Sequence, residues 1–238
     1  MLIWIIAALF SGFIKGLCGV GDTPVFSSIL SFAHNNIDIS PVSVLTSLPA
    51  NMIISWQNRK ALKTKIWLPM ALLLVVGSIP GTVLLKNTDT STLKLFFGVF
   101  IVIVGIAMLY NELGSRKIKA SKALLLLVGI LSGLSSGLFG IGVLLVVYIT
   151  LTTDDLESFR GNICAIFASE NAVRFVMYII LGLMTPAVVK RGLIILPFSL
   201  AGVFLGTRSV AFLDERKARI IIMCMLIFSG AVIVATNL

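Results

Sequence analysis

Four ionisable side chains lie inside segments that are otherwise apolar: Lys15, Asp22, Glu170 and Arg174. Placing such a group in the hydrocarbon of a bilayer costs at least about 2.5–3.5 kcal/mol on insertion scales, so these groups usually face a protein interior or a water-filled path. The two cations could bind an anion there. The two carboxyl groups could pair with the cations or carry protons.

The spacing of these residues leaves two interpretations open. Glu170 and Arg174 are four positions apart and share one helix face, while Lys15 and Asp22 flank a cluster of glycines. Each carboxylate could neutralise its cation in a structural ion pair. Alternatively the cations attract an anion, in which case Asp22 competes with that anion unless it is protonated or paired with Lys15.

Uncharged groups near these positions could complete an anion site. Asparagine and serine side chains offer hydrogen bonds, although they also bond one membrane helix to another. Backbone N–H groups in the first turn of a helix bind anions, because they lack partners and lie at the positive end of the helix dipole. The candidate substrate-binding residues are Lys15, Gly19, Gly21, Asn51, Ser135, Ser136, Gly140, Gly142, Asn171 and Arg174, with Asp22 and Glu170 as candidates for proton coupling or ion pairing.

The glycines of this set belong to a pattern that occurs twice. A serine and four glycines, Ser11, Gly12, Gly16, Gly19 and Gly21, recur 121 positions later as Ser132, Gly133, Gly137, Gly140 and Gly142. Other residues recur at similar offsets: Asn51 with Asn171 at 120, and Gly77, Gly81 and Thr82 with Gly202, Gly206 and Thr207 at 125. This collinear series predicts an internal duplication, with repeat 1 over residues 1–115 and repeat 2 over residues 116–238.

Each glycine pattern lies in an apolar stretch that is too long for one membrane-spanning helix. Residues 2–33 as a single helix would measure about 48 Å, whereas the hydrocarbon core of a bilayer is about 30 Å thick. The sequence therefore predicts half-helices that turn at Gly16–Gly21 and at Gly137–Gly142. Thr23 is the expected N-cap of the second half-helix, with Pro24 at its first position.

The composition predicts an integral membrane protein of the all-α class. Hydrophobic residues make up 58% of the 238 residues and charged residues 12%, whereas soluble domains carry about 25% charged residues. The net charge of +9 comes from loops and shows no nucleic-acid-binding pattern, so lipid and a small anion are the expected partners. Eight hydrophobic stretches can be marked, at about 2–33, 41–57, 66–86, 92–111, 123–151, 161–183, 186–207 and 218–236.

The cysteines and the single histidine predict neither a metal site nor a cofactor. Cys18, Cys164 and Cys224 are scattered in apolar runs, and His34 lies in a predicted loop. Scattered free cysteines are typically buried packing residues, which is the role expected here. An enzyme is not expected, because the sequence lacks a membrane serine–histidine pair, a second intramembrane aspartate and a set of metal ligands.

The distribution of lysine and arginine favours an arrangement in which stretches one and five turn back. In that case Lys86, Lys94, Lys190 and Arg191 lie on one side, and the other thirteen loop cations lie opposite. If all eight stretches cross, the division is ten against seven. The positive-inside rule favours the first arrangement, which gives six crossings, outside termini and two halves of inverted topology, as in many transporters. Eight plain crossings are the alternative.

Each half of the chain begins with one glycine motif. The motifs are Gly12-x-x-x-Gly16-x-x-Gly19-x-Gly21 and Gly133-x-x-x-Gly137-x-x-Gly140-x-Gly142. In these motifs, and in size and duplication, the whole chain resembles the sulfite exporter TauE/SafE family of membrane permeases. The run of glycines and a proline usual in that family is replaced by Gly21-Asp22-Thr23-Pro24 and by Gly142-Val143-Leu144. The resemblance implies a permease of the prokaryotic plasma (inner) membrane that moves sulfite, an organosulfonate such as sulfoacetate, or a related anion.

Export of such an anion through a site near mid-membrane is the expected function. A divalent anion that leaves a negative-inside cell gains about 4.6 kcal/mol at 100 mV, so export needs no coupled ion. Two alternatives stay open: a passive anion channel, and an uptake permease coupled to protons through Asp22 or Glu170.

Overall fold

The structure is a computed structural model, and the part of it described below consists of helices and the turns between them. It describes residues 1–30, 34, 36–87, 122–139, 142–153, 155–210 and 215–235, with eight single positions between 95 and 110. The helices are α1 (Leu2–Cys18), α2 (Asp22–Leu30), α3 (Asn36–Gln57), the 3-10 turn η1 (Arg59–Ala61), α4 (Thr64–Asn87), α6 (Lys122–Phe139), α7 (Val143–Thr152), α8 (Leu156–Ile180), α9 (Pro186–Ser209) and α10 (Glu215–Ala235). The predicted stretch 92–111 falls mostly outside the described residues.

Four of these helices are long and apolar enough to cross a membrane by length and composition. They are Asp38–Gln57, Thr64–Leu84, Leu156–Ile180 and Pro186–Ser209. Large apolar side chains such as Leu72, Val76 and Leu193 are more than half exposed on them. Aliphatic residues exposed in such number form a surface suited to lipid rather than to water. The described chain is therefore an all-helical integral membrane protein.

The first glycine cluster interrupts the chain between α1 and α2. α1 ends at Cys18 and is capped by Gly19, whose φ of 79° is left-handed and whose N–H donates to the Lys15 carbonyl oxygen at 2.7 Å. Gly21 also has a positive φ, 93°, and α2 begins at the next residue, Asp22. Side chains other than glycine are strained at such φ values, which explains why glycines occupy this turn.

The second glycine cluster interrupts the chain between α6, which ends at Phe139, and α7, which begins at Val143. Both interruptions are narrower than the predicted turns, because Gly16 and Gly137 are still helical. The prediction of Thr23 as an N-cap is wrong, since α2 starts one residue earlier at Asp22 and Thr23 lies in its first turn. The half-helices have 17 and 9 residues at the first glycine cluster and 18 and 10 at the second.

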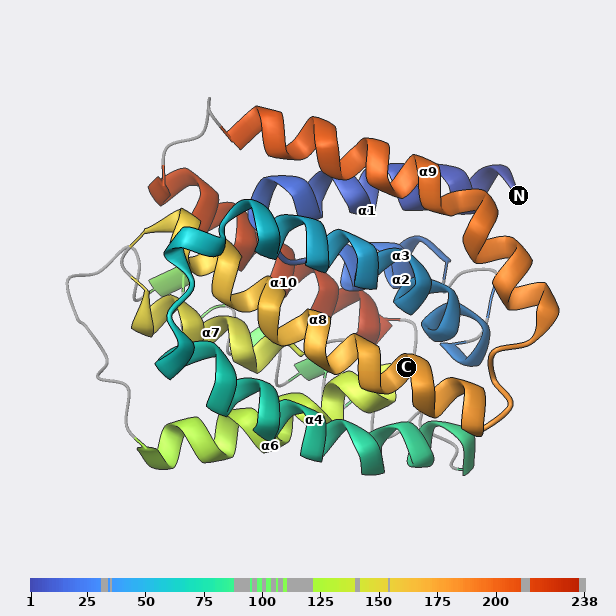
Figure 1. Cartoon of the computed structure of the whole chain (residues 1–238), viewed down its shortest axis with the longest axis horizontal. Helices are drawn as coiled ribbons and strands as arrows, with labels where there is room; N and C mark the ends of the chain where they lie inside the picture. The colour runs from blue at the N-terminus through green and yellow to red at the C-terminus, as the bar shows by residue number, and fades with distance from the viewer. Residues whose placement is uncertain are drawn as a thin grey trace.

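The long helices run roughly along the long axis of the molecule, as Figure 1 shows. α1 and α9 pair along one edge, α4 and α6 pair along the opposite edge, and α3 and α8 lie between the two pairs (Figure 1). α8 contacts α3, α4, α7 and η1, so it lies at the centre of the helix arrangement.

Glycines bring α1 and α9 into close contact. Gly12 and Gly16 of α1 face Gly202 and Gly206 of α9, and a methyl group added at any of the four would overlap main-chain atoms of the opposite helix. Small residues at such spacing let the backbones of membrane helices approach closely. We refer to this contact as the first glycine seam.

A second glycine seam joins α4 to α6. A methyl group on Gly77 would lie 2.6 Å from the Ile130 carbonyl oxygen, and one on Gly137 would lie 2.7 Å from the Thr82 nitrogen. In the first seam the equivalent contacts are from Gly202 to Leu9 and from Gly16 to Thr207, which are the partners expected from the offsets of 121 and 125. The first helix of each predicted repeat therefore packs on a helix of the other repeat: α1 packs on α9, and α6 packs on α4.

Candidate functional site

One face of α8 carries the candidate site. Its residues are spaced alternately by four and three positions, which places them along a single stripe of a helix. We call this set the α8 stripe: Arg160, Cys164, Phe167, Asn171, Arg174 and Tyr178. Phe167 is partly buried and the other five are buried. At 1.5 Å per residue, Arg160 lies about 6 Å from the start of α8, Phe167 about 16 Å and Arg174 about 27 Å.

The first predicted ion pair forms across the first glycine turn. The Lys15 ammonium lies 3.1 Å from Asp22 Oδ1, and the Ser47 hydroxyl of α3 donates to Asp22 Oδ2 at 2.5 Å. The Lys15 ammonium also lies 5.4 Å from the ring centroid of Phe167, a cation–π contact with the α8 stripe. The side chains of Lys15 and Asp22 are 2% and 14% exposed, so this pair is largely shielded from solvent.

The second predicted ion pair forms within α8. Arg174 Nε lies 3.5 Å from Glu170 Oε1, and the Ser136 hydroxyl of α6 donates to the same carboxylate oxygen at 3.0 Å. The guanidinium of Arg174 also donates to the Tyr178 hydroxyl at 2.5 Å. Glu170 Oε2 is buried without a hydrogen-bond partner, so one oxygen of this carboxyl group is left to bind a proton or another donor.

The predicted uncharged site residues are divided between α3, α6 and α8. Asn51 and Asn171 are both buried, on the two central helices α3 and α8, and Asn51 Oδ1 lacks a hydrogen-bond partner. Ser135 donates to the Ser132 carbonyl oxygen of its own helix, whereas Ser136 reaches Glu170 as described above. Ser136 therefore contacts the second ion pair from α6, and Asn171 follows Glu170 on α8. Asn51 supplies a buried polar atom on the facing helix α3.

Both glycine interruptions contact the α8 stripe. The Cys164 thiol donates to the Gly19 carbonyl oxygen at 3.2 Å, and a methyl group on Gly19 would lie 2.9 Å from Arg160 Cγ. A methyl group on Gly142 would lie 2.8 Å from the Phe167 ring. Gly21 is the residue before α2, and Gly140 lies outside the described residues.

Arg160 is a further buried charge, whereas the sequence predicts it in a loop. The sequence marked the hydrophobic stretch from about residue 161, but α8 begins at Leu156 and places Arg160 one turn inside. Arg160 is 5% exposed, and its guanidinium donates to the Gly16 carbonyl oxygen at 2.6 Å and to Thr207 Oγ1 at 3.3 Å. Its spacing of fourteen residues from Arg174, two heptads, is the signal that could have placed it on the same face.

The cysteines follow the prediction only in part. Cys18 and Cys164 are buried, but Cys224 is exposed on α10, contrary to the role expected for it. α10 is a surface helix in this region, so an apolar stretch in a membrane protein does not imply burial in protein. Cys224 therefore has no part in the candidate site.

Chemically, the arrangement brings three buried cations and two carboxyl groups to the contact between α8 and the interrupted helices. Lys15 and Arg174 each have a carboxylate partner, as the structural interpretation of the ion pairs requires. Such cations can hold an anion when the carboxylate is displaced or protonated. A set of buried cations of this kind is suited to bind an anion at a place that is shielded from both lipid and bulk water.

Comparison with known proteins identifies the family of this chain. Searches among curated proteins and among solved structures found no match. The model of the family described as sulfite exporter TauE/SafE matches residues 4–233, nearly the whole chain. Proteins of this family are membrane transporters of sulfur-containing anions such as sulfite. The chain therefore belongs to the sulfite exporter TauE/SafE family.

Proposed function

We propose that this chain is a carrier that exports a small sulfur-containing anion, sulfite or an organosulfonate such as sulfoacetate, across the plasma membrane of a prokaryote. The observation that carries the proposal is the contact of both glycine-interrupted helix pairs with the α8 stripe, where buried cations gather. Sulfite and sulfonate oxygens are strong acceptors for ammonium, guanidinium and backbone N–H groups.

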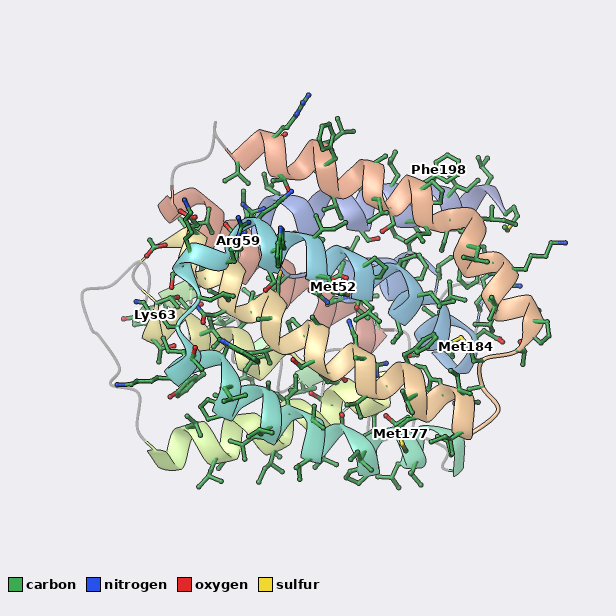
Figure 2. The ribbon with its side chains drawn as sticks, viewed as in Figure 1. Met52, Arg59, Lys63, Met177, Met184 and Phe198 are labelled. Carbon is green, nitrogen blue, oxygen red and sulfur yellow. The ribbon has the colours of Figure 1, made fainter. Side chains whose placement is uncertain are left out.

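The pairing of the helices supports two repeats of inverted topology, residues 1–115 and 116–238. The two glycine seams use residues related by the offsets of 121 and 125, as two copies of one unit would. Arg59 and Lys63, which follow the end of α3, lie toward one end of the molecule, and Met184, which follows the end of α8, lies toward the other (Figure 2). α3 and α8 therefore run in opposite directions. Half-helices of 9 and 10 residues are too short to cross a bilayer and fit re-entrant pairs.

The positive-inside rule orients the protein with the end that carries Arg59 and Lys63 toward the cytoplasm. The interruption at Gly19, which contacts Arg160, is then nearer the cytoplasmic end of α8. The interruption at Gly142, which contacts Phe167, is nearer its middle. An anion moving outward would meet the buried cations in the order Arg160, Lys15, Arg174.

Export is the proposed direction for an energetic reason. A divalent anion that leaves a negative-inside cell gains about 4.6 kcal/mol at 100 mV, so net efflux requires no second ion. Accumulation of the same anion by uptake would need an additional driving force of at least that size.

Uptake coupled to protons is a second candidate, and one observation favours it. Lys15 and Arg174 are already paired with Asp22 and Glu170, so an anion must compete with a carboxylate for each cation. Protonation of the carboxyl group would release the cation, and one proton would then accompany the anion. The unpartnered Glu170 Oε2 is the atom at which this proton would bind.

The proposal is tested by transport into proteoliposomes that contain the purified protein. Substrates are sulfite, sulfate, thiosulfate, sulfoacetate and taurine, with acetate as a carboxylate control. We expect saturable transport of at least one sulfur anion, accelerated by the same anion on the opposite side, as a carrier requires. Conductance beyond about a million ions per second would identify a channel instead, and absence of transport of every sulfur anion would reject the proposal.

A further inference from the structure

Arg160 differs from the other buried cations in its partners. Lys15 lies beside Asp22 and Arg174 beside Glu170, each within salt-bridge distance. Among the residues that the structure describes, Arg160 has no carboxylate at that distance, and its guanidinium donates to neutral oxygens of Gly16 and Thr207. Together with their partners Asp22 and Glu170, the three buried cations therefore carry a net charge of +1 rather than zero.

A buried guanidinium without a counter-charge is costly, because the low-dielectric interior solvates the charge poorly. The carbonyl groups at the C-terminal end of α1 offset part of this cost, since that end of the helix dipole is negative. The offset is incomplete, because Arg160 Nε is buried with no hydrogen-bond partner. A group that supplies negative charge and an acceptor at this nitrogen would complete the site.

The surroundings of Arg160 couple this nitrogen to the first glycine interruption. The side chain packs on Gly19, and Cys164, one turn further along α8, donates to the Gly19 carbonyl oxygen. The Gly16 carbonyl oxygen, which accepts from Arg160, belongs to the last turn of α1 and to the first glycine seam with α9. Movement of α1 at the interruption would therefore change the hydrogen bonds of Arg160 directly.

We propose that Arg160 contacts the transported anion and is its counter-charge at the cytoplasmic end of the α8 stripe. A tetrahedral or pyramidal sulfur oxyanion presents two oxygens at the spacing of Nε–H and a neighbouring guanidinium N–H, which permits a two-pronged contact. Nε is enclosed in this conformation, so the anion reaches it when the contact between Arg160 and Gly16 loosens. This inference rests on the proposed function and assigns a substrate contact for it.

The competing explanation is that Arg160 only caps α1. A cap would stabilise the fold and would not sense the anion. Two substitutions separate these roles. An amide in place of the guanidinium keeps a donor for Gly16 but removes the charge. An ammonium group keeps the charge but removes the planar, two-pronged donor geometry.

The experiment compares Arg160→Gln and Arg160→Lys with the wild type in proteoliposomes. Arg208→Gln is the matched control, because Arg208 is exposed on α9 and stacks on Phe204. Initial rates against the concentration of the best-transported sulfur anion give KM and kcat. Thermal unfolding of the purified proteins, with and without that anion, reports binding independently of turnover.

We expect Arg160→Gln to raise KM by at least about tenfold and to lose the anion-induced rise in melting temperature, as for loss of one charge-assisted contact. Arg160→Lys should recover part of both, and Arg208→Gln should match the wild type. A folded Arg160→Gln with wild-type KM and wild-type stabilisation by the anion overturns the inference. If Arg160→Gln does not fold, an unchanged KM in Arg160→Lys overturns it.

The inference can be tested even if the wild type transports no sulfur anion. In that case the thermal-shift measurement is repeated with chloride, phosphate and acetate. Stabilisation by one of these anions that Arg160→Gln removes would retain an anion site at Arg160 while the proposed substrate class fails. No Arg160-dependent stabilisation by any anion would reject both.

Discussion

The guanidinium of Arg160 donates a 2.6 Å hydrogen bond to the Gly16 carbonyl oxygen, across 144 positions of the sequence. This bond joins the central helix α8 to the end of the first interrupted helix. It also connects the α8 stripe to the first glycine seam, because Gly16 is one of the four glycines that join α1 to α9. The site and the packing of the helices are therefore parts of one contact region.

Removing one partner of the Lys15–Asp22 pair should destabilise the protein more than removing both. Breaking a buried ion pair leaves an uncompensated charge and costs about 3–5 kcal/mol. We expect Lys15→Gln and Asp22→Asn each to lower the melting temperature by roughly 10 °C in a chain of this size. The double variant should recover most of that loss. Calorimetry on the three purified variants checks this, and a double variant that is as unstable as the sum of the single variants would contradict it.

The two glycine seams should respond alike to added volume. A methyl group at Gly16 or Gly137 would meet main-chain nitrogen and oxygen atoms of the facing helix, which cannot rotate away. We expect Gly16→Ala and Gly137→Ala each to lose about 1–3 kcal/mol, or roughly 2–10 °C in melting temperature, and to lose transport.

The control for these variants is Ala201→Val, which adds volume to an exposed position of α9. It should behave as the wild type in thermal unfolding and in transport. Wild-type stability of either glycine variant would show that the corresponding seam is looser than in this structure.

Glu170→Gln should transport the anion without responding to an imposed proton gradient, if the proton-coupled candidate is correct. Glutamine mimics the protonated acid, keeps an acceptor for Ser136 and leaves Arg174 without its carboxylate partner. The measurement is the initial rate of anion transport in proteoliposomes with and without a gradient of protons. A gradient response that survives in Glu170→Gln and disappears in Asp22→Asn would move the proton carrier to Asp22.

Cysteine labelling tests the topology at two exposed positions that flank α8. Glu157→Cys lies at the start of α8 and Ala187→Cys at the start of α9, both in a background in which exposed Cys224 is replaced by serine. We expect a membrane-impermeant maleimide to label position 187 in intact cells and position 157 only after permeabilisation. The opposite pattern would reverse the orientation, and labelling of both from outside would show that α8 does not cross.

The glycine interruptions could be predicted from the sequence because their physical cause is local. A stretch too long for one membrane span, with glycines that tolerate positive φ, specifies a break within a few residues, and the structure has it between Cys18 and Asp22 and between Phe139 and Val143. The two ion pairs could also be proposed from the sequence, because Glu170 and Arg174 are one helical turn apart and Lys15 and Asp22 flank the glycine turn.

Contacts between distant segments could not be predicted in the same way. Nothing local indicates that Gly12 and Gly16 face α9, or that Ser47 reaches Asp22. The burial of Arg160 was not predicted, because a hydropathy pattern ends an apolar stretch at the first charged residue. Burial of that charge depends on Gly16, Gly19 and Thr207, which come together only when α1, α8 and α9 pack.

The central claim, that the anion binds at the α8 stripe, is tested most directly by determining the structure with selenite, a heavier analogue of sulfite, and mapping the anomalous scattering of selenium. The expected result is a selenium peak whose position puts selenite oxygens within hydrogen-bond distance of the Arg160 guanidinium, the Lys15 ammonium or the Arg174 guanidinium. A saturably transported selenite whose only peaks lie at lipid-facing surfaces or at the loops would contradict the claim.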